Sequence, residues 1–569
     1  MKKRPSSMTQ KNSNKPVKAA SGGSLVYFLL LLLVISMTDF LYYLINGHLP
    51  EAFFSITTCF CAFLLPLYFF RNHMKTYLRF LLPVLLLVPF SVGGIVLFNL
   101  PVTDGVVLAI VNTTRAEAGE LLHNYLFLFL GVLLFLALTY IVLYRRTPPN
   151  ISARISAGLS LCSLIILLLL PLADRDKQSH PHYFQRLRGR IYATFPFSIA
   201  YCSGLVYRQY HLIGDTRRQR EEFRFGASQS SLQKTRQVYV LIIGESSRYD
   251  HWALNGYPRN TSPKLSRRPN LLSFSQTVAG ACFTEFSVPQ IITCATADHF
   301  EDHYRQRSVL EAFRESGFTT YWITDQFDQG HIKMHQGDAD HLYQYSFLDP
   351  NSAKSLHHTD MELLASLKTV LSDTASKKFI LIHTMGSHFD YSARYPDGFD
   401  QFRPSLKTVA AQPNDFSKKD ILINSYDNSI LFSDSFIDST IGMVNGQHLC
   451  ASVFYISDHG ENLFDDDRKI SLHAEVTPTA FTAHVPFFIW YSDSLRNHFP
   501  DKIRWLVSHR DYKTAAEDIV PTLTDLCDIH FPLQDPSKCL DANTFRNSRQ
   551  LLVGSGMVLF QYDSMANRK

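Results

Sequence analysis

The sequence predicts a membrane domain of five helices followed by an α/β domain, whose mostly parallel sheet carries helices on both faces. The first observation is that long apolar runs crowd the first 173 of the 569 residues. The second is the alternation of short β-branched runs with helical patterns from Gln237 onward. The third is that the strongest of these runs end in Glu, Asp or His. A chain of this length exceeds one ordinary core, so we expect two domains.

The first 23 residues are basic and polar, and they predict a disordered cytoplasmic tail. The apolar run that follows is too long for a signal peptide and lacks a small-residue cleavage site. A soluble helical core is the alternative to membrane spans, but five long runs with few internal charges argue against it. We place the spans at residues 25–45, 52–70, 78–99, 124–144 and 155–173.

Basic residues predict the orientation of these spans. Lys and Arg crowd the N-terminal tail and the loops at 71–79 and 145–154, which the positive-inside rule assigns to the cytoplasm. An odd number of spans then places everything after Ala173 on the outer side. The predicted domains are a tail at 1–23, a transmembrane domain at 24–173, an interfacial helix and linker at 174–236, and a soluble domain at 237–569.

The formal net charge is +5, and the basic excess lies beside the predicted spans. This placement suggests contact with anionic lipid headgroups. We expect no nucleic-acid partner, because the sequence contains no basic-aromatic motif for one. Five of the nine cysteines fall in the soluble half without a zinc-finger C-x-x-C pair, which favours disulfides in an oxidising compartment over a Cys-ligated metal.

Two predicted strands end in residues that bind metals. The run Val238–Ile242 leads into Glu245, and the run Ala451–Ser457 ends in Asp458 and His459. Ligands of open α/β sheets bind beyond the carboxyl ends of the strands, so these side chains could be brought together as one metal site. Taken alone, the Ile-Gly-Glu-Ser turn is equally consistent with an ordinary strand-to-helix connection.

A third predicted strand, KFILIH, places His383 and His388 at or just beyond its carboxyl end, and the segment SLHAE supplies His473. A lone histidine is more often structural, but loops that converge from three strand ends favour a shared site. The hydroxyl-rich segment AGACFTEFSVPQIITCATADHF is the candidate source of a nucleophile. A divalent cation lowers the pKa of a coordinated oxygen and offsets charge on a phosphoryl group, which a weak hydroxyl nucleophile needs.

These residues resemble the membrane-bound phosphoethanolamine transferases of Gram-negative bacteria, within the alkaline-phosphatase/sulfatase superfamily. The resemblance covers nearly the whole chain, and its motifs are IGES with LNGYPRNTSP, FTEFSVP, WITDQ, HTMGSH, SYDN, SDHGE and the downstream His. It implies a bacterial inner-membrane protein whose residues 237–569 form a periplasmic catalytic domain with the alkaline-phosphatase/sulfatase-like fold.

The resemblance also implies roles for individual residues. Glu245, Thr284, Asp458 and His459 match the family's zinc ligands, and Thr284 also matches the nucleophile that accepts phosphoethanolamine. The oxygen-rich ligand set suits manganese as well as zinc.

Four further positions match family residues around the substrates. His388 and His473 match the histidines around the phosphoryl group, and Thr113 and Glu117 match a membrane-proximal motif associated with the lipid substrate. The implied reaction is ping-pong transfer from phosphatidylethanolamine to lipopolysaccharide through Thr284, in which diacylglycerol leaves with a proton from one of the two histidines.

The chain departs from the family pattern in two places. The segment Gly-Ala-Cys-Phe-Thr-Glu replaces the family's Cys-Gly-Thr-x-Thr-Ala, and Gly330 and His331 stand where lipid A-modifying members carry a lysine. Both departures favour the branch that modifies the lipopolysaccharide core, at a phosphorylated heptose, over the lipid A branch. With the family's disulfide displaced, we predict bridges Cys282–Cys294 and Cys527–Cys539, with Cys450 free and buried.

Two other functions fit parts of the pattern. A glycerol phosphotransferase of the lipoteichoic-acid-synthase type shares five spans and a metal-bound threonine, but it uses phosphatidylglycerol and belongs to Gram-positive cells. A non-catalytic, membrane-tethered binding protein would have lost a ligand, whereas every ligand position here is filled. A sulfatase activity is disfavoured because no Cys/Ser-x-Pro-x-Arg precursor of formylglycine is present.

Overall fold

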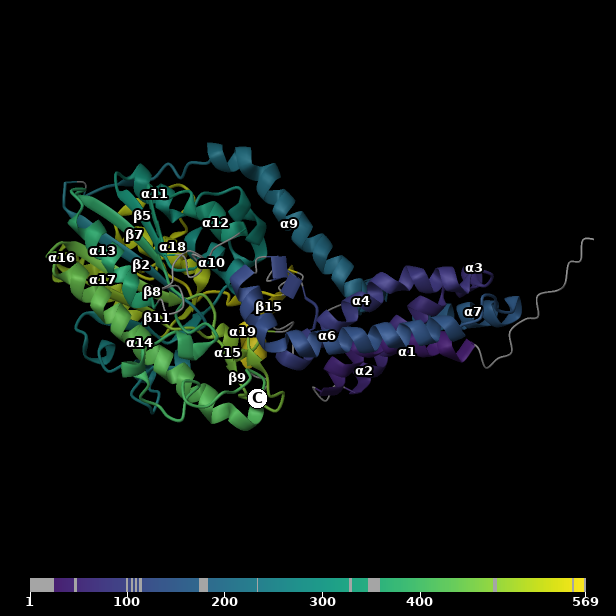
Figure 1. Ribbon diagram of the computed structural model, residues 1–569. Helices are drawn as coiled ribbons and strands as arrows, with labels where there is room; N and C mark the ends of the chain where they lie inside the picture. The colour runs from purple at the N-terminus through teal and green to yellow at the C-terminus, as the bar shows by residue number, and fades with distance from the viewer. Residues whose placement is uncertain are drawn as a thin grey trace, which may run out of the picture. The chain divides into compact units, whose positions relative to one another are not determined.

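The chain divides into two compact units, one made of residues 1–93 and 125–198 and the other of residues 94–124 and 199–569. The structure is a computed structural model (Figure 1). It describes residues 25–45, 49–98, 101–103, 106–107, 110–111, 115–172, 183–232, 234–326, 330–345, 359–473, 478–554 and 557–566.

Four helices of the described residues are long and apolar enough to cross a membrane. The spans are Leu25–Ile45, Met74–Val96, Phe129–Arg146 and Ala153–Leu172. They lie within the helices α1 (Leu25–Ile45), α4 (Met74–Phe98), α6 (Arg115–Arg146) and α7 (Ala153–Leu169), the last continued by a short 3₁₀ turn. The predicted fold class, an apolar helical part followed by an α/β part, is confirmed.

The second predicted span differs from the other four. It forms α2 (Leu49–Leu64) and α3 (Leu67–Phe70), with a turn between them at Pro66. Proline lacks the backbone N–H that a continuous helix needs, which explains the break. The 16 residues of α2 rise only about 24 Å, short of the ~30 Å hydrocarbon core, so its ability to cross depends on the residues beside it.

A pair of reporter fusions tests whether the segment at 52–70 crosses the membrane. Five crossings put the C-terminus outside, whereas four would return it to the cytoplasm. We expect a reporter that works only in the periplasm to be active at the C-terminus and silent after Arg146. Activity after Arg146, with protein levels matched by immunoblot, would contradict the five-span topology.

The soluble part is built on a seven-stranded mixed sheet in the order β3-β11-β8-β2-β7-β5-β6. The five strands from β8 to β6 are parallel, and β11 and β3 are antiparallel to their neighbours. Figure 1 shows β5, β7, β2, β8 and β11 side by side. The strands are β2 (Gln237–Gly244), β3 (Leu271–Phe274), β5 (Thr319–Thr324), β6 (His341–Gln344), β7 (Lys377–His383), β8 (Cys450–Ser457) and β11 (Phe487–Tyr491).

Both faces of this sheet are buried, as the continuous apolar runs predict. Along β2, Tyr239, Leu241 and Ile243 enter one core, whereas the alternate residues enter the other. The first core is covered by α10 (Thr284–Ile292), α11 (Val309–Glu315) and α18 (Ile519–Leu526). The second is covered by α13 (Leu363–Ser372) and α14 (Lys419–Asn445).

Two helices precede the sheet in the region predicted as an interfacial helix and linker. They are α8 (Tyr183–Tyr192) and α9 (Phe197–Glu222). The 26 residues of α9 rise about 39 Å at 1.5 Å per residue. A further helix, α12 (Gly330–Gln336), lies between β5 and β6 in the chain and contacts α10.

The predicted disulfides do not form. All nine cysteines lie in described residues and none of them is in a disulfide. Cys282 and Cys294 stand on either side of the nine-residue helix α10, which separates their Cα atoms by more than about 13 Å, beyond the ~7 Å limit of a bridge. The Cys539 thiol instead lies 3.5 Å from the Pro521 carbonyl oxygen. Cys450 is buried, as predicted.

Candidate active site

Glu245 and Asp458 are brought together by the register of two neighbouring strands. The last residue of β2, Gly244, pairs with the last residue of β8, Ser457, and each carboxylate follows directly. The Asp458 backbone N–H donates to the Gly244 carbonyl at 3.0 Å, which continues the pairing one step beyond the strands. Two residues more than two hundred positions apart therefore share one carboxyl edge of the sheet.

Glycine is required where these strand ends meet other backbone. At Gly386, after β7, the backbone has φ +46°, and an added Cβ would lie 2.8 Å from the backbone N and O of Glu245. At Gly460, an added Cβ would lie 2.1 Å from the Phe481 carbonyl oxygen. Only a residue without a side chain allows these approaches, which explains the glycines of HTMGSH and SDHGE.

Thr284, Glu245, Asp458 and His459 form one compact cluster. The Thr284 hydroxyl donates to Glu245 Oε2 at 3.1 Å and lies 3.3 Å from His459 Nε2. The same imidazole nitrogen lies 3.2 Å from Glu245 Oε1 and 3.3 Å from Asp458 Oδ2. Glu245, Asp458 and His459 are almost fully buried. Each offers one ligand atom, and these atoms lie within 4.8 Å of one another.

The cluster fits a divalent cation. Asp458 Oδ1 accepts hydrogen bonds from the backbone N–H groups of Ser246 and His459, at 3.1 and 2.7 Å. Asp458 Oδ2 is buried and accepts no hydrogen bond from any described residue. An unsatisfied buried carboxylate oxygen is costly, and a cation between the carboxylates would satisfy it. Two carboxylates and an imidazole are zinc ligands, and a catalytic site leaves a fourth position, which the Thr284 hydroxyl is near enough to fill.

The electrostatics of the cluster point the same way. Burial raises the pKa of the Asp458 carboxyl, and the nearby Glu245 carboxylate raises it further, to about 8. Burial lowers the pKa of His459, but the carboxylates of Asp458 and Glu245 outweigh this effect and raise it to about 10. Protons on Asp458 and His459 therefore balance the charge of the buried carboxylates, and a bound cation would take the place of these protons.

Thr284 is the first residue of α10, so its hydroxyl lies at a helix N-terminus. The Ser287 hydroxyl, one turn further, donates to the Asp458 carbonyl oxygen and ties this end of the helix to the end of β8. Backbone N–H groups at a helix N-terminus favour negative charge. The position suits a group that receives an anionic phosphoryl group.

His388 and His473 form a second group around Glu245. Ligand atoms of these three residues lie within 4.8 Å of one another, and the His473 ring centroid lies 4.2 Å from that of His459. His388 Nδ1 lies 2.6 Å from the Phe389 carbonyl oxygen. Because a carbonyl only accepts, Nδ1 carries the proton, and the neutral ring has its lone pair on Nε2.

The carboxylate of Glu461 orients His473. Glu461 Oε1 lies 3.2 Å from His473 Nδ1, and burial raises the pKa of Glu461 to about 8. Burial lowers the pKa of His388, and the Glu245 carboxylate opposes this effect only in part. His383, the other histidine of the HTMGSH segment, is the last residue of β7 and is fully buried.

The pattern-based prediction omitted Gln326 and Glu461 as site residues. The Gln326 side-chain amide donates to Glu245 Oε2 at 3.1 Å and to the Thr384 carbonyl at 2.9 Å. Its position just beyond the carboxyl end of β5 was the available signal, because this is the same edge of the sheet. Thr113 lies outside the described residues, and Glu117 falls within α6.

A third group of metal-binding side chains lies elsewhere in the soluble part. Asp525, Cys539 and Asp541 place ligand atoms within 4.8 Å of one another. Lys502 already places its ammonium group 2.7 Å from Asp525 Oδ2 and 3.6 Å from Asp541 Oδ2. Lys502, which is not one of the three metal-capable residues, therefore already supplies positive charge to this group.

Comparison with known proteins agrees with the fold and the motifs. The chain is 26% identical over 338 residues to the phosphoethanolamine transferase EptC of Escherichia coli strain K12, and the alignment covers 57% of each protein. The chain thus matches little more than half the length of this curated relative. The resemblance inferred from the motifs is confirmed.

Two solved structures share the fold. The C-terminal periplasmic domain of EcEptC from Escherichia coli, in a complex with Zn, has a TM-score of 0.54 at 26% identity, over 60% of this chain and 96% of that one. The lipooligosaccharide phosphoethanolamine transferase A (EptA) of Neisseria meningitidis, an integral membrane protein, has a TM-score of 0.67 at 21% identity, over 93% of this chain and 98% of that one. The second likeness covers the apolar helices as well as the sheet.

The family model described as Sulfatase matches residues 237–529. This range is more than half of the chain, and it contains β2, β8, α10 and all the residues of the Thr284 cluster. The chain therefore belongs to the sulfatase family.

Proposed function

We propose that this protein transfers phosphoethanolamine from phosphatidylethanolamine to lipopolysaccharide, with Thr284 as a covalent carrier. The observation that supports this most directly is the Thr284 hydroxyl, 3.1 Å from Glu245 and 3.3 Å from His459 at a buried cluster. The similarity to proteins named phosphoethanolamine transferase supports the choice of transferred group. The apolar helices support a membrane-embedded donor and an inner-membrane location.

We infer that Glu245, Thr284, Asp458 and His459 hold zinc, which the similar E. coli domain binds in its crystals. The same oxygen-rich set also suits manganese. When bound, the cation lowers the pKa of the threonine hydroxyl and offsets negative charge on the phosphoryl group.

The reaction has two half-reactions, and Glu245 and one histidine carry out the proton transfers. In the first, Thr284 Oγ1 bonds to phosphorus and its proton passes to Glu245 Oε2, to which it already donates. The bond from phosphorus to the diacylglycerol oxygen breaks, and His388 or His473, which must enter this step in its protonated form, donates a proton to that oxygen. In the second, the same histidine removes a proton from the acceptor, and the acceptor oxygen bonds to phosphorus. The bond from phosphorus to Thr284 Oγ1 breaks, and this oxygen recovers its proton from Glu245.

Removing either histidine tests this assignment. We expect His388→Ala and His473→Ala each to slow release of diacylglycerol by roughly 10²-fold, the usual contribution of a proton-transfer group. The zinc content should stay at the wild-type level, because neither side chain belongs to the Glu245–Asp458–His459 group. The exposed His498→Ala serves as the control. Wild-type rates in both site variants, or loss of zinc from either, would contradict the role.

The function is tested by the masses of lipopolysaccharide fragments from cells with and without the protein. We infer that the acceptor is a phosphorylated heptose of the core, because the nucleophile loop and the Gly330-His331 segment depart from the lipid A-modifying pattern. Deleting the gene should remove one phosphoethanolamine increment from the core fragment and leave the lipid A fragment unchanged. If the increment were lost from the lipid A fragment instead, the acceptor would be lipid A and not the core heptose. If neither fragment changed in mass, the proposed function would be rejected.

A further inference from the structure

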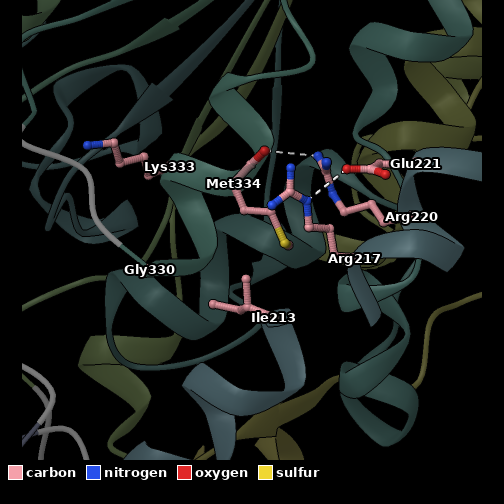
Figure 2. Close-up of a pocket in the computed structure, with 7 residues that line it drawn as sticks. All are labelled: Ile213, Arg217, Arg220, Glu221, Gly330, Lys333 and Met334. Carbon is pink, nitrogen blue, oxygen red and sulfur yellow. Dashed lines mark hydrogen bonds and ion pairs between the residues drawn. The ribbon is translucent and has the colours of Figure 1, made fainter. Parts of the chain in front are cut away.

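A pocket with a volume of about 390 Å³ lies between α9 and α12, within the soluble unit. Ile213, Arg217, Arg220 and Glu221 line it from α9, at spacings that place them on one face of a helix. Residues 330, 333 and 334 line it from α12 (Figure 2). None of these side chains belongs to the Thr284 cluster.

The pocket combines basic side chains with the apolar side chains of Ile213 and Met334. Three lining side chains are cationic (Arg217, Arg220 and Lys333) and one, Glu221, is anionic. Figure 2 shows the guanidinium groups of Arg217 and Arg220 close together beside Met334, with Lys333 directed away from them. Two neighbouring guanidinium groups repel each other, and an anion between them would relieve the repulsion.

Arg220 is held in place. Its Nη2 donates to both carboxylate oxygens of Asp338 at 2.7 Å and to the Met334 carbonyl at 2.9 Å. Its side chain is only 12% exposed, and its buried Nε makes no hydrogen bond with any described residue. Asp338 is shared with Arg307, which lies 3.6 Å from the same carboxylate and also pairs with Glu311 at 3.3 Å.

Arg217 is the exposed member of the arginine pair. It pairs with Glu221 at 2.8 Å, but the two side chains are 78% and 56% exposed. An exposed pair at this spacing contributes little to stability, so a stronger anion can replace Glu221. A phosphate offers several oxygens to the planar donors of a guanidinium group, which makes it the anion that arginine recognises best.

The pocket is connected to the Thr284 cluster by α12. On its inner side, the His331 ring lies 6.1 Å from that of Phe286, two residues after Thr284. At its start, α12 follows Gln326, which donates to Glu245. Packed helices lie 8–10 Å apart, so the outer side of α12 is on the order of 20 Å from the nucleophile. A phosphorylated oligosaccharide is long enough to reach both places.

We propose that this pocket binds a phosphate group of the acceptor, a phosphorylated glycolipid, at a distance from the residue that receives the phosphoethanolamine. The proposal rests on the proposed function. Arg217 and Arg220 contact the phosphate, and Ile213 and Met334 contact the apolar face of a sugar. The pocket thereby raises acceptor affinity without taking part in the chemistry at Thr284.

Charge reversal at Arg217 tests the proposal, because Arg218 provides a matched control. Arg218 lies on the same helix, pairs with Glu222 at 2.9 Å and is 87% exposed, but does not line the pocket. With full-length protein in nanodiscs and purified phosphorylated lipopolysaccharide, Arg217→Glu should raise the acceptor KM about tenfold, since a charge-assisted contact becomes a repulsion. The kcat and the acceptor-free release of diacylglycerol should not change, and Arg218→Glu should match wild type.

A second comparison identifies the phosphate. With lipopolysaccharide dephosphorylated by hydrofluoric acid, wild type and Arg217→Glu should have the same KM. The proposal would be overturned if wild type and Arg217→Glu had the same KM for phosphorylated acceptor. It would also be overturned if Arg218→Glu raised this KM as much as Arg217→Glu does. A KM difference that follows the phosphatidylglycerol content of the nanodisc instead of the acceptor phosphate would assign the pocket to a phospholipid headgroup and likewise overturn it.

A binding measurement separates this proposal from the proposed function. Fluorescent phosphorylated lipopolysaccharide should bind Thr284→Ala protein about tenfold more tightly than the Thr284→Ala/Arg217→Glu double variant. If the two variants differ in this way but the wild-type protein shows no transfer activity, the pocket proposal is kept and the proposed function is rejected. Equal binding by both variants, with transfer intact in wild type, would reject the pocket and keep the function.

Discussion

Thr284→Ala is expected to abolish phosphoethanolamine transfer, with a loss of roughly 10⁴-fold or more, as for other covalent nucleophiles. Alanine has no oxygen to bond to phosphorus, and the rest of the cluster cannot replace it. Thr284→Ser should retain measurable activity, because the hydroxyl is the chemical requirement. The measurement is the release of diacylglycerol from phosphatidylethanolamine by purified protein in nanodiscs.

A threonine at the other end of the same helix provides the control for this substitution. Thr293 follows α10, where its hydroxyl donates to the Pro289 carbonyl at 2.6 Å. The same hydroxyl accepts a hydrogen bond from the Ala295 backbone N–H at 3.1 Å. Thr293→Ala should therefore cost about 2 kcal/mol of stability, for two buried hydrogen bonds, and leave the rate close to wild type. Full activity in Thr284→Ala would show that another residue is the nucleophile, and Ser287, one turn along α10, would be the next to test.

Glu245→Ala, Asp458→Ala and His459→Ala are each expected to lower zinc affinity by at least about 100-fold, because a ligand is lost outright from a small set. Each variant should also lose transfer activity to the level of Thr284→Ala. Elemental analysis of the purified proteins measures the metal directly.

The third metal-capable group provides the comparison for the zinc measurement. Asp541 belongs to the group in which Lys502 already supplies a positive charge. Asp541→Asn should therefore retain wild-type zinc. Full zinc in all three variants of the Thr284 cluster would reject the metal site, whereas zinc lost from Asp541→Asn would show that the measurement reports a different ion.

Local pattern predicted the ends of the strands well. Continuous apolar runs predicted that β2, β7 and β8 are buried on both faces, and the polar residue after each run then had to lie at the carboxyl edge. Glu245 and Asp458 followed from this reasoning. The close approach of these two carboxylates in space could not be predicted in this way. It depends on the pairing of Gly244 with Ser457, and local sequence does not show which strands become neighbours.

The nucleophile illustrates a limit of reasoning from residue types. The hydroxyl-rich segment that includes α10 contains Thr284 and Ser287, and chemistry alone does not choose between them. The family resemblance selected Thr284, and in the structure its hydroxyl faces Glu245 and His459, whereas Ser287 donates to a backbone carbonyl. Orientation on a helix distinguishes the two residues.

The errors have identifiable physical causes. The Cys282–Cys294 bridge was predicted as a displaced form of the family's disulfide, but a nine-residue helix separates these two cysteines. The second apolar segment was predicted as one continuous helix, but a turn at Pro66 divides it into α2 and α3. The crossing of the membrane by this segment stays a prediction. The basic pocket could not be predicted, because it requires one face of α9 and one face of α12 to lie opposite each other.

The central claim, that Thr284 carries the phosphoethanolamine group, is tested most directly by mapping the covalent intermediate. Full-length protein in nanodiscs containing phosphatidylethanolamine with a labelled ethanolamine group is quenched in acid without acceptor, digested and analysed by mass spectrometry. We predict the label on the peptide that contains Thr284, its absence in Thr284→Ala, and its disappearance when phosphorylated lipopolysaccharide is added before the quench. A label on any other residue, or transfer to the acceptor with no labelled peptide at any time, would contradict the account.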